Sequence, residues 1–164
     1  MSSFFMRFPG GRAKALTLSY DDGVEQDIRL MEIMAKNGLK GTFNLNSGLY
    51  APEGTVYPAG HIHRRMTRRQ VSEAFLGSGQ EVAAHGLTHP FLEQLPGDRV
   101  VYEILRDREN LEEQFGTLVR GMAYPFGTYN DRVVEALRMC GIVYARTTVS
   151  TNDFRVPGDW LRMG

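Results

Sequence analysis

Two short stretches of the sequence place side chains that bind metal ions or move protons close together. Asp21 and Asp22 are adjacent in "SYDDG", and His85 and His89 are four residues apart in "HGLTH". Imidazole and carboxylate ligands around an open coordination position are typical of a catalytic divalent metal site. If the chain turns at Gly86, both imidazoles can reach one point, and either Asp21 or Asp22 could add the carboxylate.

Each stretch also has a purely structural interpretation. Two histidines at this spacing can be solvated or partly buried loop residues, and Asp22 or Asp27 can favour the start of the helix that follows. The combination favours a site, because both stretches follow predicted strands whose carboxyl ends would lie on the same face.

The elements that would position these residues alternate between strand and helix. We expect strands at about 13–20, 40–47, 80–86, 118–127 and 142–148, and helices at about 25–38, 68–79, 98–116 and 129–141. Such alternation favours a parallel sheet or barrel with helices outside, whose ligand site lies at the carboxyl ends of the strands. Residues 48–66 form a long loop without periodicity, and loops of this length are usually functional or disordered.

The composition narrows the class of protein. A chain of 164 residues with 42% apolar content predicts a single domain, and 19 basic against 19 acidic residues favour neither nucleic acid nor an anionic membrane as partner. No apolar stretch is long enough to insert into a membrane, and the start lacks the apolar core of a signal peptide. As written, the chain is expected to be cytoplasmic, or extracytoplasmic if it is a fragment. Its single cysteine, Cys140, excludes an internal disulfide and is expected to be buried.

Together with "AYPFG", the two stretches reveal a family resemblance. "SYDDG", "HGLTH" and "AYPFG", in this order, resemble the metal-dependent polysaccharide deacetylases, the NodB-type domains of carbohydrate esterase family 4. The resemblance implies an α/β fold, a distorted seven-stranded (β/α) barrel that is incomplete at its C-terminus. It covers about residues 13–160 of a single domain over 1–164. It further implies hydrolysis of acetyl groups from an N-acetylated, or O-acetylated, oligo- or polysaccharide.

The resemblance also assigns roles to the four residues. It implies that Asp21 is the catalytic base and that Asp22, His85 and His89 bind the metal, which we expect to be zinc, with Co2+, Ni2+ or Mn2+ as alternatives. A bound divalent ion lowers the pKa of its water towards about 7 and polarises a carbonyl group. Its charge also relieves the repulsion between the adjacent carboxylates.

The third motif departs from the family pattern, which is R-P-P-Y-G. Ala123 stands where the family has an arginine that orients the catalytic aspartate, and Arg120, Arg146 or Arg162 could take over that task. Phe126 stands where tyrosine is common, although its backbone amide can still donate to the oxyanion. Tyr124 and Phe126 are expected either to contact substrate or to be ordinary wall aromatics.

Two further family features are altered or missing. Asp159 and Trp160 match an aspartate-tryptophan pair that forms one wall of the site, with Trp160 expected to contact the sugar. The histidine that acts as general acid in the family has no counterpart before Gly164, although His61 or His63 could in principle deliver a proton. We therefore expect a fragment, or a shortened variant completed by a partner subunit.

Two alternatives to a sugar deacetylase follow from these departures. The same scaffold could hydrolyse a linear or cyclic amide that is not a sugar. A catalytically impaired domain that still binds metal or carbohydrate is the other alternative, because Ala123 and the missing acid weaken the case for catalysis.

Overall fold

The strands form one parallel sheet in the order in which they occur along the chain. The computed structural model describes residues 8–152 and 154–164. Neighbouring strands pair in the order β1-β2-β3-β4-β5, all parallel. They are β1 (Ser19–Asp21), β2 (Thr42–Leu45), β3 (Glu81–Ala84), β4 (Gly121–Ala123) and β5 (Tyr144–Arg146).

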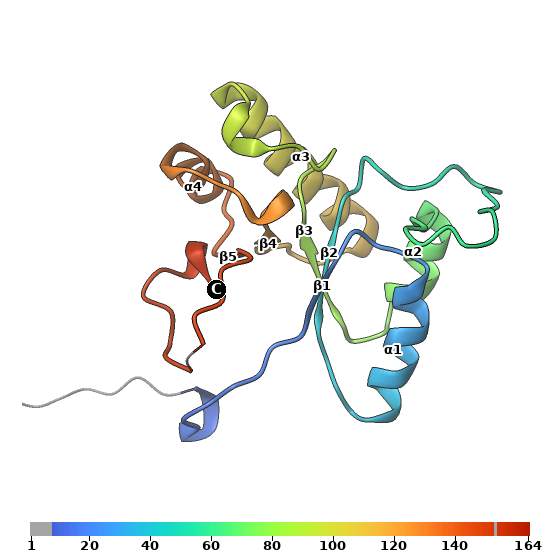
Figure 1. Cartoon of the computed structure of the whole chain (residues 1–164), viewed down its shortest axis with the longest axis horizontal. Coiled ribbons are helices and arrows are strands. Elements are labelled where there is room, and N and C mark those ends of the chain that lie inside the picture. The colour runs from blue at the N-terminus through green and yellow to red at the C-terminus, as the bar shows by residue number, and fades with distance from the viewer. Residues whose placement is uncertain (1–7, 153) are drawn as a thin grey trace, which may run out of the picture.

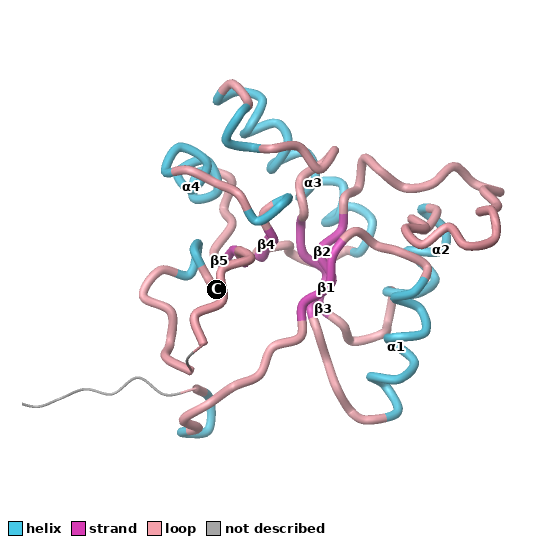
Figure 2. Tube along the Cα trace, in the orientation of Figure 1, coloured by secondary structure: helices cyan, strands magenta, loops and turns pink. Residues whose placement is uncertain are grey.

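Helices surround the strands, as Figures 1 and 2 show. The α-helices are α1 (Gln26–Lys36), α2 (Arg68–Phe75), α3 (Gly97–Phe115) and α4 (Asp131–Met139). Short 3-10 turns lie at η1 (Pro9–Gly11), η2 (Leu92–Gln94), η3 (Pro125–Gly127) and η4 (Trp160–Arg162). The expected alternation of strand and helix is therefore confirmed.

Apolar residues that alternate along the strands form the core with one face of each helix. Phe43 and Leu45 of β2 and Met122 of β4 are completely buried, and α3 packs against β3 and α4. α2 starts at an N-cap, since Thr67 and Gln70 form a reciprocal capping box. Cys140, at the end of α4, is a free buried thiol whose pKa is raised by burial.

The first strand is much shorter than expected. Residues 13–18 read as a buried strand, but only Ser19–Asp21 forms one, and Leu16 is 85% exposed. Pairing with β2 begins only where the Thr42 amide donates to the Leu18 carbonyl oxygen at 2.8 Å. Before that point no strand among the described residues pairs with this segment, so its alternating pattern is not matched by burial.

A contact between the two edge strands shows that the sheet is curled. Neighbouring strands lie about 4.8 Å apart, so β1 and β5 would be separated by roughly 19 Å in a flat sheet. Instead, Arg146 Nη2 of β5 lies 2.5 Å from Asp21 Oδ1 of β1. The five strands thus form a curled half-barrel, which confirms the predicted incomplete α/β barrel.

Small residues leave room inside the curl for larger polar ones. Gly121 faces the ring of Tyr144, and a Cβ at position 121 would lie only 2.1 Å from ring atoms. The Tyr144 hydroxyl donates to Glu81 Oε1 at 2.7 Å, and the Thr42 hydroxyl donates to Glu81 Oε2 at 2.6 Å. Thr42, Glu81 and Tyr144 lie one layer nearer the amino ends of the strands than Asp21 and Arg146 do.

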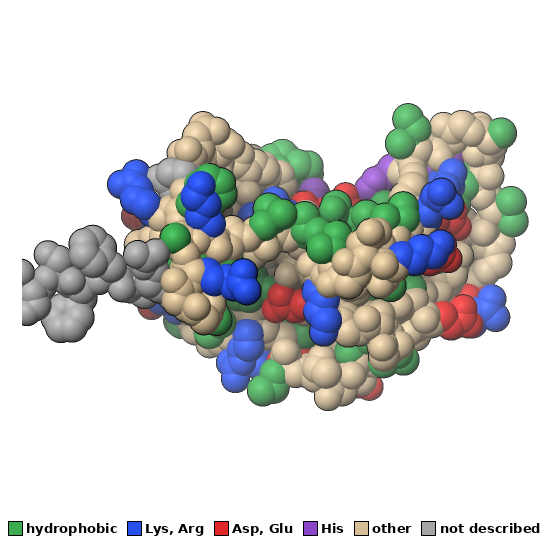
Figure 3. Space-filling view, turned by 90° about the horizontal axis from the view of Figure 1, so that it is seen from below, with side chains coloured by type: hydrophobic (Ala, Val, Ile, Leu, Met, Phe, Trp, Pro, Cys, Tyr) green, Lys and Arg blue, Asp and Glu red, His purple; other side chains and the backbone are tan. Residues whose placement is uncertain are grey.

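Charged side chains of both signs are spread over the face seen in Figure 3, without a large patch of one sign. This distribution fits the zero formal net charge of the chain. Among the described residues, no helix combines the length and the apolar character needed to cross a bilayer.

Candidate active site

Asp21 ends β1 and points into the curl, where three hydrogen bonds fix its carboxylate. Arg146 Nη2 donates to both carboxylate oxygens, at 2.5 and 2.6 Å, and Asn44 Nδ2 donates to Oδ1 at 2.9 Å. Arg146 Nε in turn donates to the Ser19 hydroxyl at 2.9 Å. Because the Asp21 side chain is still 35% exposed, the carboxylate is held in place yet remains open to a reactant.

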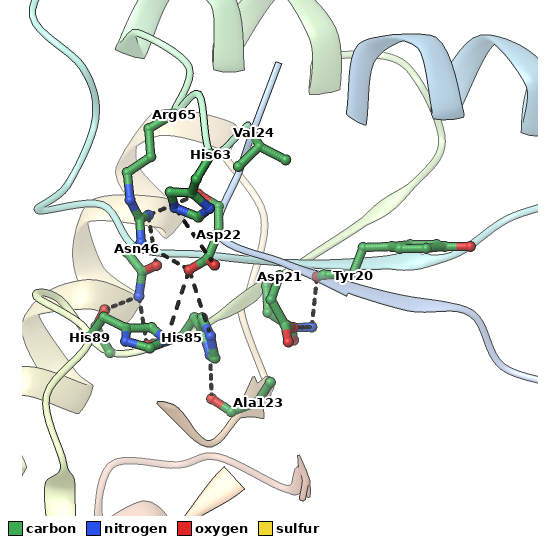
Figure 4. Close-up of polar contacts among 12 residues, drawn as sticks. Tyr20, Asp21, Asp22, Val24, Asn46, His63, Arg65, His85, His89 and Ala123 are labelled. Atoms are coloured by element: carbon green, nitrogen blue, oxygen red, sulfur yellow. Dashed lines mark hydrogen bonds and ion pairs between the residues drawn. The ribbon is translucent and has the colours of Figure 1, made fainter. Parts of the chain in front are cut away.

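Asp22 is directed towards the two histidines rather than into the curl (Figure 4). Its backbone is left-handed, with φ of 78°, and Gly23 continues the turn. Nε2 of His85 and Nε2 of His89 each lie 3.9 Å from Asp22 Oδ1. The ligand atoms of the three residues all lie within 4.8 Å of one another.

This arrangement fits a divalent metal ion. Bonds of about 2.0–2.2 Å to a common centre require ligand atoms about 3–4 Å apart, so only a small closure of the three side chains is needed. One carboxylate and two imidazoles also leave coordination positions open for water and substrate. Asp22, His85 and His89 are therefore the described residues that could hold the metal.

The surroundings of His85 prepare its ring to be a ligand. Nδ1 lies 2.8 Å from the Ala123 carbonyl oxygen, which can only accept, so Nδ1 carries the proton and Nε2 keeps its lone pair. The side chain is 3% exposed, and burial lowers the pKa of His85, which favours the neutral form. Metal binding requires this neutral imidazole.

The long loop at 48–66 reaches Asp22 from the side opposite the histidine pair (Figure 4). Arg65 donates to the Asp22 carbonyl oxygen, to Asp22 Oδ1 and to Asn46 Oδ1, each at 2.9 Å. His63 Nε2 lies 3.9 Å from Asp22 Oδ2. His61 does not take part, because its ring stacks on Tyr57 with 5.1 Å between centroids.

Arg65 belongs to the basic cluster "HRRMTRR", which directly precedes and enters α2, but it does not face solvent. Its side chain is only 18% exposed because it lies against Asp22. The loop is anchored nearby, where the Met66 amide donates to the Gly23 carbonyl oxygen at 2.9 Å. The loop is thus part of the site rather than a solvated connection.

The two aromatic residues of the third motif behave differently. Tyr124 is 2% exposed, donates its hydroxyl proton to the Leu161 carbonyl oxygen at 2.8 Å and stacks on Tyr129. The Tyr124 ring therefore lies in the core, and its contact with substrate stays a prediction. Phe126 is 50% exposed and has a left-handed backbone, with φ of 59°.

Phe126 forms an aromatic wall beside the candidate metal ligands. Its ring packs against His89 at a centroid distance of 4.4 Å and stacks on Phe91 at 3.9 Å. His89 itself has a left-handed backbone, with φ of 53°. Phe91, which the sequence did not single out, is 40% exposed.

Trp160 lies in a different place from the metal ligands. It lines a groove of about 480 Å³ between residues 15–17 and the C-terminal segment, and Asp22, His85 and His89 are not among the lining residues. Asp159 caps η4 and pairs with Arg162. The role of Trp160 in binding sugar stays a prediction.

Of the three arginines that could replace the one missing at Ala123, only Arg146 contacts Asp21 among the described residues. Arg120 donates to the Gly141 carbonyl oxygen at 3.1 Å, and Arg162 Nη2 pairs with Asp131 at 2.7 Å. Arg146 can contact Asp21 because the curl of the sheet brings β5 close to β1.

Two buried acidic residues of α3 also contact the histidine loop, and no pattern in the sequence indicated them. Glu103 and Asp107 are 3% and 0% exposed. In a helix rich in charged residues they look like members of its solvated face.

The fold and the site together define a class of α/β protein with a curled parallel sheet and a candidate metal centre at the carboxyl ends of its strands. The model of the family described as polysaccharide deacetylase matches residues 9–145. The chain belongs to the polysaccharide deacetylase family.

Among characterised proteins, the peptidoglycan-N-acetylglucosamine deacetylase PgdA of Listeria monocytogenes is similar. It is 24% identical over 145 residues, which are 87% of this chain. The chain spans only 27% of the length of that relative.

Several solved structures share the fold. The Streptococcus pyogenes deacetylase PplD, in complex with acetate, superposes with a TM-score of 0.72 at 24% identity, covering 87% of this chain and 58% of the other. IcaB from Ammonifex degensii gives 0.73 at 22% identity, covering 98% and 75%. A family 4 pseudoenzyme from Bacillus anthracis gives 0.63 at 21% identity, covering 80% and 42%.

Proposed function

We propose that this chain is a zinc-dependent deacetylase that hydrolyses the acetamido group of an N-acetylated sugar, as the name of its Listeria relative says of that protein. The observation that carries the proposal is the pairing of two neighbouring carboxylates with different surroundings. Asp22 converges with His85 and His89, whereas Asp21 is held apart by Arg146. A metal-binding group and a free base are the two parts that amide hydrolysis needs first.

Each residue has a separate task in this proposal. Asp22, His85 and His89 would hold the zinc ion, which supplies activation of water and polarisation of the carbonyl group when bound. Asp21 accepts a proton from the water whose oxygen bonds to the acetyl carbon. Arg146 keeps the Asp21 carboxylate aimed at that water, and the Phe126 amide donates to the oxygen that becomes negative.

The C–N bond then breaks, and the sugar amine leaves with a proton. Asp21 can return the proton it accepted to the amine nitrogen, so that the products are a free amine and acetic acid, which releases its proton to solvent and becomes acetate. Of the two loop histidines, His63 is the one to test as an additional donor, because it lies near Asp22. A His63→Gln variant with an unchanged kcat would remove it from the mechanism.

The aromatic wall offers a surface for the sugar. Phe91 and Phe126 are stacked and partly exposed beside His89. Aromatic rings give apolar contact at little entropic cost, and such contact suits the C–H face of a sugar ring.

Metal content and acetate release test the proposal together. Purified wild-type protein should bind about one zinc ion, and Asp22→Ala or His89→Ala should lose it. Asp21→Asn should keep the zinc but release acetate from N-acetylglucosamine oligomers about 10²–10⁴ times more slowly. A wild-type chain that binds no divalent metal would refute the site assignment.

The same assays separate the alternatives. Hydrolysis of simple linear or cyclic amides with no activity on acetylated sugars would favour the non-sugar amidohydrolase. Zinc or carbohydrate binding without any acetate release would favour a binding domain.

A further inference from the structure

Glu103 and Asp107 lie one helical turn apart on α3, so their side chains share one face of the helix. That face is turned towards the loop that carries His85 and His89, since α3 packs against β3. Both side chains are buried, and among the described residues no arginine or lysine forms an ion pair with either. Their acceptors serve groups of the loop instead.

Asp107 holds the backbone on both sides of the site. Its Oδ2 accepts from the His85 amide at 3.0 Å, and the same amide also donates to the Leu45 carbonyl oxygen. Its Oδ1 accepts from the Ser47 amide at 2.8 Å and from the Ser47 hydroxyl at 2.7 Å. One carboxylate therefore ties the end of β3 to the end of β2.

Glu103 holds the segment between the two histidines. Its Oε2 accepts from the Thr88 amide at 2.8 Å and its Oε1 from the Thr88 hydroxyl at 2.9 Å, while its carbonyl oxygen accepts from the Leu87 amide at 3.1 Å. Thr88 directly precedes His89, whose left-handed backbone sets the direction of its ring.

Burying a carboxylate without a cationic partner is energetically unfavourable. A helix that needed only to pack would use apolar residues at these positions. Groups that fix metal ligands through hydrogen bonds typically change metal affinity 10- to 100-fold when they are mutated.

We propose that Glu103 and Asp107 are positioning residues of the metal site, which hold His85 and His89 at the spacing a metal ion requires. The inference rests on the proposed metal site. It differs from that proposal in assigning the geometry of the site to a helix that supplies no ligand.

The contacts predict that the two positions tolerate amides differently. A glutamine at 103 can accept from the Thr88 amide with its oxygen and donate to the Thr88 hydroxyl with its nitrogen, because a hydroxyl can also accept. An asparagine at 107 has no such solution. In either orientation its NH2 group faces a backbone N–H, that of His85 or that of Ser47.

The test compares zinc affinity, measured by competition with a chromogenic chelator, in matched variants that are fully folded at the assay temperature. Glu103→Gln should bind zinc within about threefold of wild type, while Glu103→Met and Asp107→Asn should bind about 10- to 100-fold more weakly. Glu109→Gln, which removes a charge from the exposed face of the same helix, controls for charge. Val71→Ala, a core change in α2, controls for loss of stability.

The outcomes are separable. If the wild type binds zinc and Asp107→Asn and Glu103→Met bind it with the same affinity, the inference is overturned while the proposed metal site stands. If Val71→Ala weakens zinc binding as much as these two variants do, the effect is one of general stability, and the inference is likewise overturned. If Asp107→Asn does not fold, the Glu103→Gln and Glu103→Met pair decides. A wild type that binds no zinc refutes the proposed metal site and the inference with it.

Discussion

Replacing Arg146 tests whether an arginine from β5 does the work that the family assigns to the third motif. In Arg146→Ala, Asp21 loses two of its three hydrogen bonds and keeps only the one from Asn44 at 2.9 Å. The carboxylate remains present but is free to rotate away from the reacting water. Zinc binding should not weaken, because Arg146 contacts none of the three metal ligands among the described residues.

The expected size of the effect follows from these contacts. Removing a general base altogether slows a reaction about 10²–10⁴-fold. The loss expected for Asp21→Asn is therefore the upper limit for the loss in Arg146→Ala. A displacement of about 1 Å in a reacting group can cost about 10². Because one hydrogen bond still holds Asp21, we expect kcat for Arg146→Ala to fall about 10- to 100-fold. The kcat of Arg146→Lys should lie between those of the wild type and Arg146→Ala.

The assay is acetate release from N-acetylglucosamine oligomers, with unfolding measured in parallel because Arg146 also joins the two sheet edges. Arg120→Ala, which removes an arginine bound to a distant carbonyl group, serves as the control. If Arg146 acts through Asp21, the double variant with Asp21→Asn should be no slower than Asp21→Asn alone. Unchanged kcat in Arg146→Ala, or losses that multiply in the double variant, would refute the reasoning.

Two further predictions concern stability. Gly121→Ala should lower the free energy of unfolding by about 1–3 kcal/mol, measured by urea titration, because the added methyl group would displace Tyr144; an unchanged midpoint would contradict this packing. Burial raises the pKa of Asp27 to about 6, so the folded state keeps this proton between about pH 4 and 6 while the unfolded state has lost it. Relative to Asp27→Asn, wild-type stability should therefore fall by roughly 2–3 kcal/mol as pH rises from 4 to 7, and parallel curves would contradict the shift.

The order of the elements was predictable because each strand and helix carries its own periodicity. Their bounds were less so, since a strand also needs a neighbour. Residues 13–17 alternate like a strand but pair with no strand among the residues that the structure describes, and Leu16 is left exposed. Local pattern alone cannot show where pairing begins.

The candidate metal ligands and the candidate base were chosen from motifs, whereas the residues that contact them were not predictable from the sequence. The choice of Arg146 among three arginines depends on the curl of the whole sheet, which no local segment encodes. Arg65 is one of several basic residues in its segment, and Glu103 and Asp107 are two of many charged residues in α3. Their sequence context therefore did not distinguish them. Charged residues that are buried against a loop have the same sequence pattern as those that face water.

Three residues of the site share an unusual backbone. Of the four described non-glycine residues with positive φ, three are Asp22, His89 and Phe126. Such conformations cost about 1–3 kcal/mol at each position and persist only where the surroundings enforce them. A library screened for thermal stability alone would therefore be enriched in glycine at these three positions. In this protein, selection for a more stable fold would favour glycine at these three positions, whereas selection for the proposed chemistry would keep the side chains that are present.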